Sequence, residues 1–173
     1  MEKILSTILQ RSSVRSFTED KIPQKDVEKI LQAAMAAPTA VNKQPWEFIV
    51  IDSASLLFEL GSLLPYAKMA KFAPLAIVVC GNQKNMLEGW EESFWIQDCS
   101  AATENLLLAV EALGYGAVWT AVFPDITRIH IVRRVLELPP HIIPLNVIPI
   151  GVPAHEKTPK NKFNPKKIHY NKW

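Results

Sequence analysis

Leu75-Ala76-Ile77-Val78-Val79-Cys80 is the stretch that decides the fold, because it places six apolar residues in a row between Pro74 and Gly81. A strand with one face in water alternates apolar and polar residues, whereas an unbroken apolar run predicts a strand covered on both faces. Gly81 and Asn82 are expected to end it. The sequence therefore predicts a central strand inside a layered structure.

The segments on either side of this strand carry alternating helix and strand patterns. Apolar residues at one-turn spacing predict helices that end at about residue 11, run from residue 22 to Pro38, run from about residue 91 to 113, and run from about residue 125 to 138. Large and β-branched residues predict strands at residues 46–51, 117–120 and 147–151. Helices interleaved with buried strands indicate an αβ domain layered around one sheet. No repeat or linker divides the chain, so residues 1–173 are expected to form a single domain.

Composition excludes several classes of protein. The chain has 19 Lys+Arg against 17 Asp+Glu and a net charge of +2, and it contains no module of alternating aromatic and basic residues, so we expect no nucleic-acid partner. No apolar run approaches the roughly 20 residues that cross a bilayer. The first residues do not have the pattern of a secretory signal, and a cytoplasmic location is expected.

The two cysteines and four histidines do not point to a disulfide framework or a metal site. Cys80 and Cys99 form no CxxC motif, and no histidine has the spacing of a zinc ligand. Both thiols are expected to be reduced and structural. The histidines are expected to be surface or packing residues.

Arg11-Ser12-Ser13-Val14-Arg15 follows the first predicted helix and brings two guanidinium groups and two hydroxyls together. Arginine matches phosphate oxygens with two parallel hydrogen bonds, and neighbouring hydroxyls can complete an anion site. The alternative is that the arginines only complement the helix dipole and the serines fill a turn.

The loop from Pro38 to Trp46 carries two amide side chains, Asn42 and Gln44, between two prolines. A rigid loop of this kind can present amides to a polyhydroxyl or heteroaromatic ligand. Asn and Gln are equally ordinary turn residues, and Trp46 is ordinarily a core anchor.

Two further segments of the chain contain several aromatic residues. Residues 90–95 open the long helix with two acids and three aromatics, which favours an interface or core role over a place at a substrate opening. The last residues, from Lys157 to Trp173, are rich in Lys and Pro and yet end in aromatic side chains that need a surface to bury against. This arm packs either on another subunit or back on its own domain.

Taken in order, five segments of the chain resemble the FMN-dependent nitroreductase family over essentially its whole length. They are Arg-Ser-Ser-x-Arg-x-Phe at 11–17, Ala-Pro-x-x-x-Asn-x-Gln-Pro-Trp-x-Phe at 37–48, Leu-Gly-Tyr-Gly-Ala-Val-Trp at 113–119, Ile-Gly-x-Pro at 150–153, and Lys-Phe followed by His-Tyr-Asn-Lys-Trp at 162–173. Each motif is loose alone, but their order and spacing are specific. The resemblance implies an α+β fold, with a central mixed or antiparallel sheet flanked by helices and a C-terminal arm extended onto a partner subunit.

The resemblance also implies a homodimer with FMN bound at the subunit interface. Arg11, Ser12 and Ser13 would hold the FMN phosphate, and Arg15 would reach the N1–C2=O edge of the ring, where reduced flavin carries negative charge. The other implied contacts are Pro38, Thr39, Ala40 and Asn42 from the partner, Trp119, Thr120 and Ala121 beside the ring, and Lys162, with Lys160 as a second candidate, on the phosphate. Lys162 stands where many relatives carry arginine, and lysine keeps the charge without the fork.

The activity that the resemblance implies is electron transfer from NAD(P)H through flavin N5 to an electron-poor acceptor, of nitroaromatic or quinone type, by a ping-pong mechanism. No side chain needs to act as a nucleophile or an obligatory acid. Ala40 replaces a serine of several relatives, and Leu64-Pro65 stands where others place a glutamine, so the hydrogen bonds to the flavin edge are in doubt. Alternatives are flavin storage or sensing without turnover, and reductive dehalogenation or flavin modification on the same scaffold.

Overall fold

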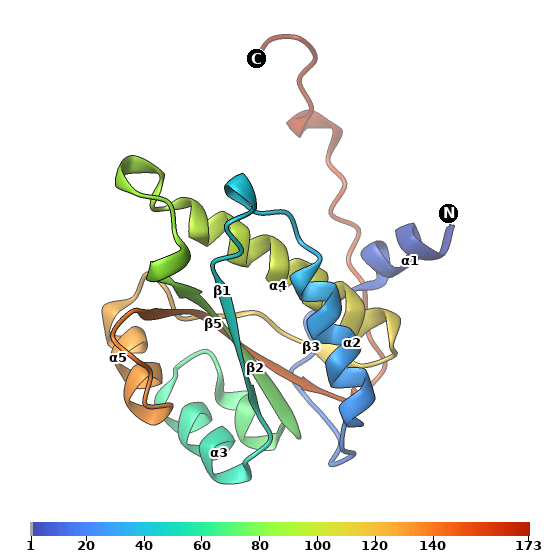
Figure 1. The fold of residues 1–173 in the computed structure, drawn as a ribbon. Coiled ribbons are helices and arrows are strands. Elements are labelled where there is room, and N and C mark those ends of the chain that lie inside the picture. The colour runs from blue at the N-terminus through green and yellow to red at the C-terminus, as the bar shows by residue number, and fades with distance from the viewer. Residues whose placement is uncertain (1) are drawn as a thin grey trace.

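The apolar run at residues 75–80 lies in the middle of a five-stranded antiparallel sheet in the computed structural model, which describes residues 2–173 (Figure 1). Strand β2 (Leu75–Asn82) pairs with β1 (Trp46–Ile51) on one side and with β5 (Ile142–Gly151) on the other. Successive side chains of a strand point to opposite faces. Leu75, Ile77 and Val79 accordingly enter one core and Ala76, Val78 and Cys80 the other, which confirms the prediction of a strand covered twice.

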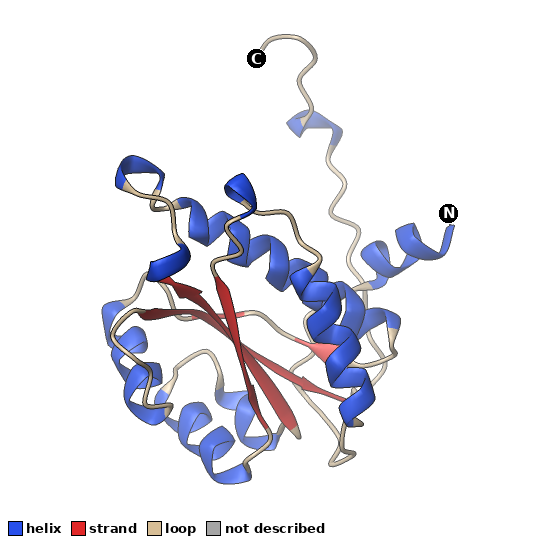
Figure 2. Cartoon of the chain, in the orientation of Figure 1, coloured by secondary structure: helices blue, strands red, loops and turns tan. Residues whose placement is uncertain are grey.

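Two helices cover each face of the sheet (Figures 1 and 2). The first core lies under α2 (Gln24–Met35) and α4 (Phe94–Ala112), and the second lies under α3 (Ala54–Leu63) and α5 (Ile126–Val135). Helix α1 (Glu2–Gln10) contacts α4. The short 3-10 turns are η1 (Ala40–Asn42), η2 (Lys68–Phe72), η3 (Gln83–Asn85), η4 (Gly89–Glu91) and η5 (Pro165–Lys167). Among residues 2–173, no helix is long and apolar enough to cross a bilayer.

The strand that pairs with the outer side of β5 is interrupted and forms two short strands. Strands β3 (Gly116–Ala117) and β4 (Thr120–Ala121) both pair with β5, so the single strand predicted at residues 117–120 is wrong. Val118 and Trp119, which lie between β3 and β4, do not pair with β5. Their gap lies opposite Ile148 and Pro149 of β5, and a proline without an N–H is tolerated where a ladder is interrupted.

Three other boundaries differ from the sequence prediction. The long helix begins at Phe94 and not at residue 91, because residues 89–91 form the separate turn η4. Helix α5 ends at Val135, and Glu137 then takes a positive φ of 52°. Strand β5 begins at Ile142, five residues before the predicted start, since Pro144 near its beginning argues against a strand.

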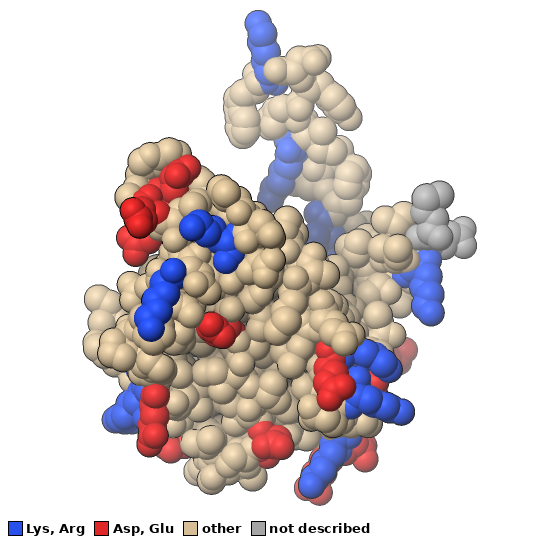
Figure 3. All heavy atoms as spheres, in the orientation of Figure 1, with Lys and Arg blue, Asp and Glu red and all other residues tan. Residues whose placement is uncertain are grey.

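Both ends of the chain carry exposed apolar side chains. On α1 they include Ile4, Leu5 and Leu9, and on the C-terminal arm, residues 157–173, they include Phe163, Tyr170 and Trp173. The arm runs away from the body of the molecule (Figure 1). Its charged side chains are all basic, whereas acidic side chains gather over the loop that precedes α4 (Figure 3).

Candidate cofactor site

The segment that joins α1 to α2 is held against the sheet by two close contacts. A Cβ built on Gly116 of β3 would lie 2.7 Å from Cβ of Val14, and one built on Gly151 of β5 would lie 2.9 Å from the Phe17 ring. Both positions therefore admit only glycine without displacing these side chains. The second glycine of the Leu-Gly-Tyr-Gly motif and the glycine of the Ile-Gly-x-Pro motif thus make room for residues 11–17.

Backbone hydrogen bonds complete the attachment of this segment. Val14 N–H donates to Ala117 O at 2.9 Å, and Thr18 N–H donates to Val152 O at 2.9 Å. The carbonyl of Ser16 accepts from Ala154 N–H at 3.0 Å. Residues 13–16 are consequently fixed between β3 and the chain that leaves β5, with Val14 packed on Gly116 and the side chains of Ser13, Arg15 and Ser16 exposed.

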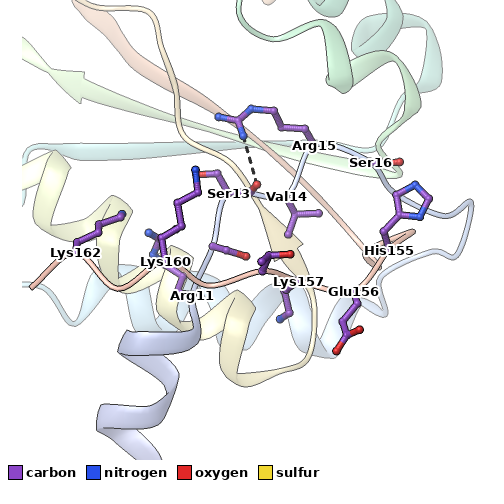
Figure 4. Close-up of a pocket in the computed structure, with 12 residues that line it drawn as sticks. Arg11, Ser13, Val14, Arg15, Ser16, His155, Glu156, Lys157, Lys160 and Lys162 are labelled. Atoms are coloured by element: carbon purple, nitrogen blue, oxygen red, sulfur yellow. Dashed lines mark hydrogen bonds between the residues drawn. The ribbon is translucent and has the colours of Figure 1, made fainter.

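A cavity of about 470 Å³ opens beside this segment, and we call it the basic cavity (Figure 4). It brings together two parts of the chain that are far apart in sequence, residues 11–16 and the beginning of the C-terminal arm. Its lining residues are Arg11, Ser12, Ser13, Val14, Arg15, Ser16, His155, Glu156, Lys157, Thr158, Lys160 and Lys162. Five cationic side chains with several hydroxyls suit an anionic group such as a phosphate.

The charges of the basic cavity are partly neutralised from α4. Arg11 Nε lies 3.7 Å from Glu104 Oε1, and Lys157 Nζ lies 2.7 Å from Glu111 Oε1. Arg15 donates only to the carbonyl of Ser13, at 3.4 Å (Figure 4). The side chains of Arg15, Lys160 and Lys162 are exposed, and none of the ion pairs within residues 2–173 involves them. These three remain available for an anionic ligand.

Arg15 also lines a second cavity, of about 500 Å³. The remaining lining residues are Ser16, Phe17, Glu19, Lys71, Phe72, Ala73 and Pro74. Sequence reasoning missed Lys71 here, and it also assigned no ligand role to His155 in the basic cavity. Neither residue belongs to a motif, and only the fold brings them beside Arg15.

The predicted contacts at residues 38–42 do not line either cavity. They form a loop at the N-terminal part of α4, where the buried carboxylate of Asp98 accepts the Ala40 N–H at 2.9 Å. Val41, Asn42 and Gln44 all have positive φ, and the Val41 side chain is 80% exposed. A β-branched residue in this conformation is strained and persists only where its surroundings impose it.

The predicted contacts at residues 119–121 lie at the break between β3 and β4. Thr120 is only 4% exposed and its hydroxyl donates to Val147 O, so its side chain is not free to meet a ligand. Trp119 packs against the first core. The carbonyl of Ala121 accepts from Arg128, whose guanidinium lies 4.7 Å from the centre of the Tyr66 ring. Any ligand contact here would be made by backbone groups.

The aromatic residues before and at the start of α4 separate into two kinds. Trp95 is buried and packs edge-on against Phe123, with ring centres 5.0 Å apart, so it belongs to the core. Trp90 is 80% exposed and makes an edge-to-face contact with Phe94 at 5.9 Å.

The two thiols are unsuited to chemistry near neutral pH. Both are buried and free, and burial raises the pKa of Cys80 to about 12 and also raises the pKa of Cys99. A thiol needs a lowered pKa to act as a nucleophile. Within the described part of the chain, no group of three or more His, Cys, Asp or Glu side chains could hold a metal ion.

Comparisons with known proteins show which family the chain belongs to. The model of the nitroreductase family matches residues 8–71 and 57–152. A protein of Methanothermobacter thermautotrophicus, provisionally named NADH dehydrogenase/NAD(P)H nitroreductase, is 42% identical over 171 residues, covering 98% of this chain and 87% of that protein. A crystal structure from Parabacteroides distasonis with the same provisional name has 47% identity and a TM-score of 0.94, and 99% of each chain is covered.

A third comparison concerns a cofactor complex. The crystal structure of a provisionally assigned nitroreductase in complex with FMN, from Desulfovibrio desulfuricans, is 27% identical with a TM-score of 0.83, and the match covers 98% of this chain and 97% of that one. The α+β fold is therefore shared along nearly the whole chain. The chain belongs to the nitroreductase family.

Proposed function

We propose that this protein is an FMN-dependent oxidoreductase that passes electrons from NAD(P)H to an electron-poor acceptor of the nitroaromatic or quinone type. The observation that carries the proposal is the basic cavity, where the Arg-Ser-Ser segment and the lysines of the arm meet. Membership of the nitroreductase family and the FMN complex of the Desulfovibrio relative support it.

The basic cavity fits the phosphate of FMN. Arg11, Ser12 and Ser13 would hold the phosphate from one wall, and Lys160 and Lys162 would hold it from the other. Arginine offers a fork of donors and each lysine a point charge, so Arg11 would set the orientation of the phosphate.

Arg15 stands where the basic cavity and the second cavity adjoin, which suits a ligand whose anionic tail and ring lie on its two sides. FMN, when bound, supplies the electron chemistry by accepting a hydride at N5 and passing the electrons on. The guanidinium of Arg15 would stabilise negative charge that develops at the N1–C2=O edge. Backbone groups of Trp119, Thr120 and Ala121 would border the ring, since the ladder is open at Trp119.

We propose a homodimer in which the partner supplies Pro38, Thr39, Ala40 and Asn42 to each FMN. This loop lines neither cavity of its own chain, although its strained conformation indicates a presenting role. The exposed apolar side chains of α1 and of the C-terminal arm give such a dimer surfaces to bury. The arm would extend onto the partner.

The proposed reaction is of the ping-pong type, with NAD(P)H and the acceptor using one pocket in turn. No protein side chain has to take or give a proton in it. The chain's residues bind the phosphate, orient the ring and hold a cation at its pyrimidine edge.

The test begins with a visible spectrum of the purified protein after incubation with FMN. A yellow protein that is bleached rapidly by NADH or NADPH in anaerobic stopped-flow mixing, and reoxidised by a quinone or a nitroaromatic, supports the proposal. A protein that remains colourless refutes it. Bound flavin that is not bleached would instead favour a storage or sensing role.

A further inference from the structure

Two carboxylates of α4 hold cations of the basic cavity from behind. Glu104 faces Arg11 and Glu111 faces Lys157, and the two acids are seven residues apart, which places them on one side of the helix about two turns from each other. The two pairs differ in strength of contact. Arg11 and Glu104 are 3.7 Å apart with Glu104 50% exposed, whereas Lys157 and Glu111 are 2.7 Å apart with Glu111 only 9% exposed.

The turn after α4 strengthens the contact of Lys157. Gly114 takes a φ of 86°, and Tyr115 N–H then donates back to Val110 O at 3.0 Å, which closes the helix with a Schellman motif. In this arrangement the Tyr115 carbonyl accepts a second hydrogen bond from Lys157 Nζ at 3.4 Å. An ammonium at the C-terminal end of a helix is also favoured by the helix dipole.

Tyr115 links the same point to α2. Its hydroxyl donates to Asp26 Oδ2 at 2.9 Å, and this hydrogen bond, together with the larger effect of Lys29, lowers the pKa of Asp26. The first residue of the C-terminal arm is thus attached to the end of α4, and through Tyr115 to α2, while all the residues after Lys157 are exposed.

We propose that the ion pair between Lys157 and Glu111 is a positioning element that fixes where the arm begins, and so places Lys160 and Lys162 in the basic cavity. The inference rests on the proposed function, since it assigns those two lysines to the FMN phosphate. Lys157 lines the cavity as well, but its charge is committed to Glu111. Lys160 follows only three residues later, so a fixed Lys157 confines it to within about 11 Å of chain.

The direction of one measured change separates this role from direct binding. If Lys157 were a phosphate ligand, replacing Glu111 by glutamine would free a cation and remove a nearby negative charge, and FMN would bind more tightly. If the pair positions the arm, the same replacement releases Lys160 and Lys162 from their place, and FMN binds more weakly. Direct binding by Lys157 therefore predicts a lower Kd of FMN for Glu111→Gln, whereas positioning of the arm predicts a higher Kd.

The experiment measures the Kd of FMN by quenching of flavin fluorescence for wild type, Glu111→Gln, Lys157→Met and the double variant. Each single variant is expected to raise Kd roughly 5- to 20-fold, and the double variant no further than the larger single effect, because the two residues act as one unit. Glu59→Gln on α3 is the control. It removes the same charge from an exposed carboxylate that lines neither cavity, and it is expected to leave Kd unchanged.

A second readout needs no cofactor. Trypsin cuts after lysine, and the arm offers Lys160, Lys162, Lys166 and Lys167. Cleavage of the arm in the apoprotein is expected to be at least about threefold faster in Glu111→Gln than in wild type. The single variant Lys157→Arg keeps the cation and is expected to be cleaved at the wild-type rate. The double variant leaves no unpaired charge, so it serves if a single variant does not fold by circular dichroism.

Tighter FMN binding by Glu111→Gln, or arm cleavage equal to that of wild type, would overturn the inference. A wild-type protein that does not bind FMN would overturn the proposed function instead, and the cleavage rates would still decide whether Lys157 and Glu111 anchor the arm.

Discussion

At the scale of single residues, the cations of the basic cavity are not equivalent. Arg11 is partly covered and faces Glu104, whereas Arg15, Lys160 and Lys162 are exposed. A partly buried guanidinium has lost side-chain freedom already, so ordering it around a phosphate costs less than ordering an exposed lysine. Arg11 should therefore contribute more to cofactor retention than either lysine.

Arg11→Ala is expected to weaken FMN binding by about 1.5 to 3 kcal/mol, the range for a hydrogen bond to a charged group, which corresponds to roughly 10- to 150-fold in Kd. A fluorescence titration measures it. Arg134→Ala on α5 is the control, because Arg134 is exposed and lines neither cavity, and it should not change Kd. Equal affinities in wild type and Arg11→Ala would show that the motif is misassigned.

The buried thiols predict a fall in stability at alkaline pH. An unfolded thiol loses its proton near its ordinary pKa of 9.0, while the folded protein keeps the Cys80 proton until about pH 12. The unfolded state therefore binds fewer protons between these values, and the free energy of unfolding decreases as pH rises through this window. Urea titrations from pH 8 to 11 measure this, and Cys80→Ala with Cys99→Ala should flatten the dependence.

At the scale of elements, the sheet serves the site through its glycines. Gly116 and Gly151 lie on neighbouring strands β3 and β5, and each allows a side chain of residues 11–17 to approach the backbone closely. The absence of a side chain at these two positions thus lets the Arg-Ser-Ser segment lie close to the sheet.

Gly116→Ala is expected to lower the free energy of unfolding by about 1 to 3 kcal/mol, the usual cost of overpacking, and to weaken FMN binding as well, because Val14 must move. Thermal unfolding and FMN titration are measured together. Gly89→Ala provides a comparison, since its cost comes from a positive φ alone and its Cβ meets no atom within 4 Å. It should cost stability without changing FMN affinity. If Gly116→Ala binds FMN with wild-type affinity, the contact between Gly116 and Val14 is not needed for the cofactor site.

The strained loop at residues 38–44 depends on a single buried carboxylate. Asp98→Ala removes the acceptor of the Ala40 N–H and is expected to cost about 1 to 3 kcal/mol of stability and to weaken FMN binding. Asp98→Asn keeps an acceptor oxygen and should recover most of both. Denaturant unfolding and FMN titration provide the values, with Glu47→Ala as an exposed control. Identical FMN affinity in Asp98→Ala would separate this loop from the cofactor.

The elements differ in how far the sequence predicted them. The central strand was predictable because six consecutive apolar residues exclude an exposed face, and the Schellman end of α4 was predictable from Gly114. The start of β5 was not, because Pro144 argues against a strand unless the irregular pairing of β2 opposite it is known. In the site, a motif marks Arg11 to Arg15, but only tertiary contacts bring Lys71 and His155 beside them.

At the scale of the whole molecule, apolar surface is concentrated at the two ends of the chain. Helix α1 and the arm expose Leu5, Leu9, Tyr170 and Trp173, among others, to solvent. A surface of this kind on an isolated chain indicates burial against another molecule. The proposed homodimer accounts for both ends at once.

Full-length protein is expected to elute as a species of about twice 19.5 kDa in size-exclusion chromatography with light scattering. Removal of residues 163–173 keeps Lys160 and Lys162 but deletes the arm's aromatic side chains, and it should shift the species toward one chain and weaken FMN binding. A chain ending at Lys172, which loses Trp173 alone, is the milder comparison. A monomeric full-length protein that binds FMN normally would contradict the dimer.

Arg15 belongs to the walls of two cavities. In the proposed site, Arg15 therefore affects both the reactivity of the flavin ring and the retention of FMN. A replacement of Arg15 that altered the first would also alter the second. The range of electron acceptors is easier to change at positions that affect only one of these two properties. Lys71 and Phe72 line the second cavity alone, and a library randomised at these two positions would explore new acceptors at little risk to cofactor retention.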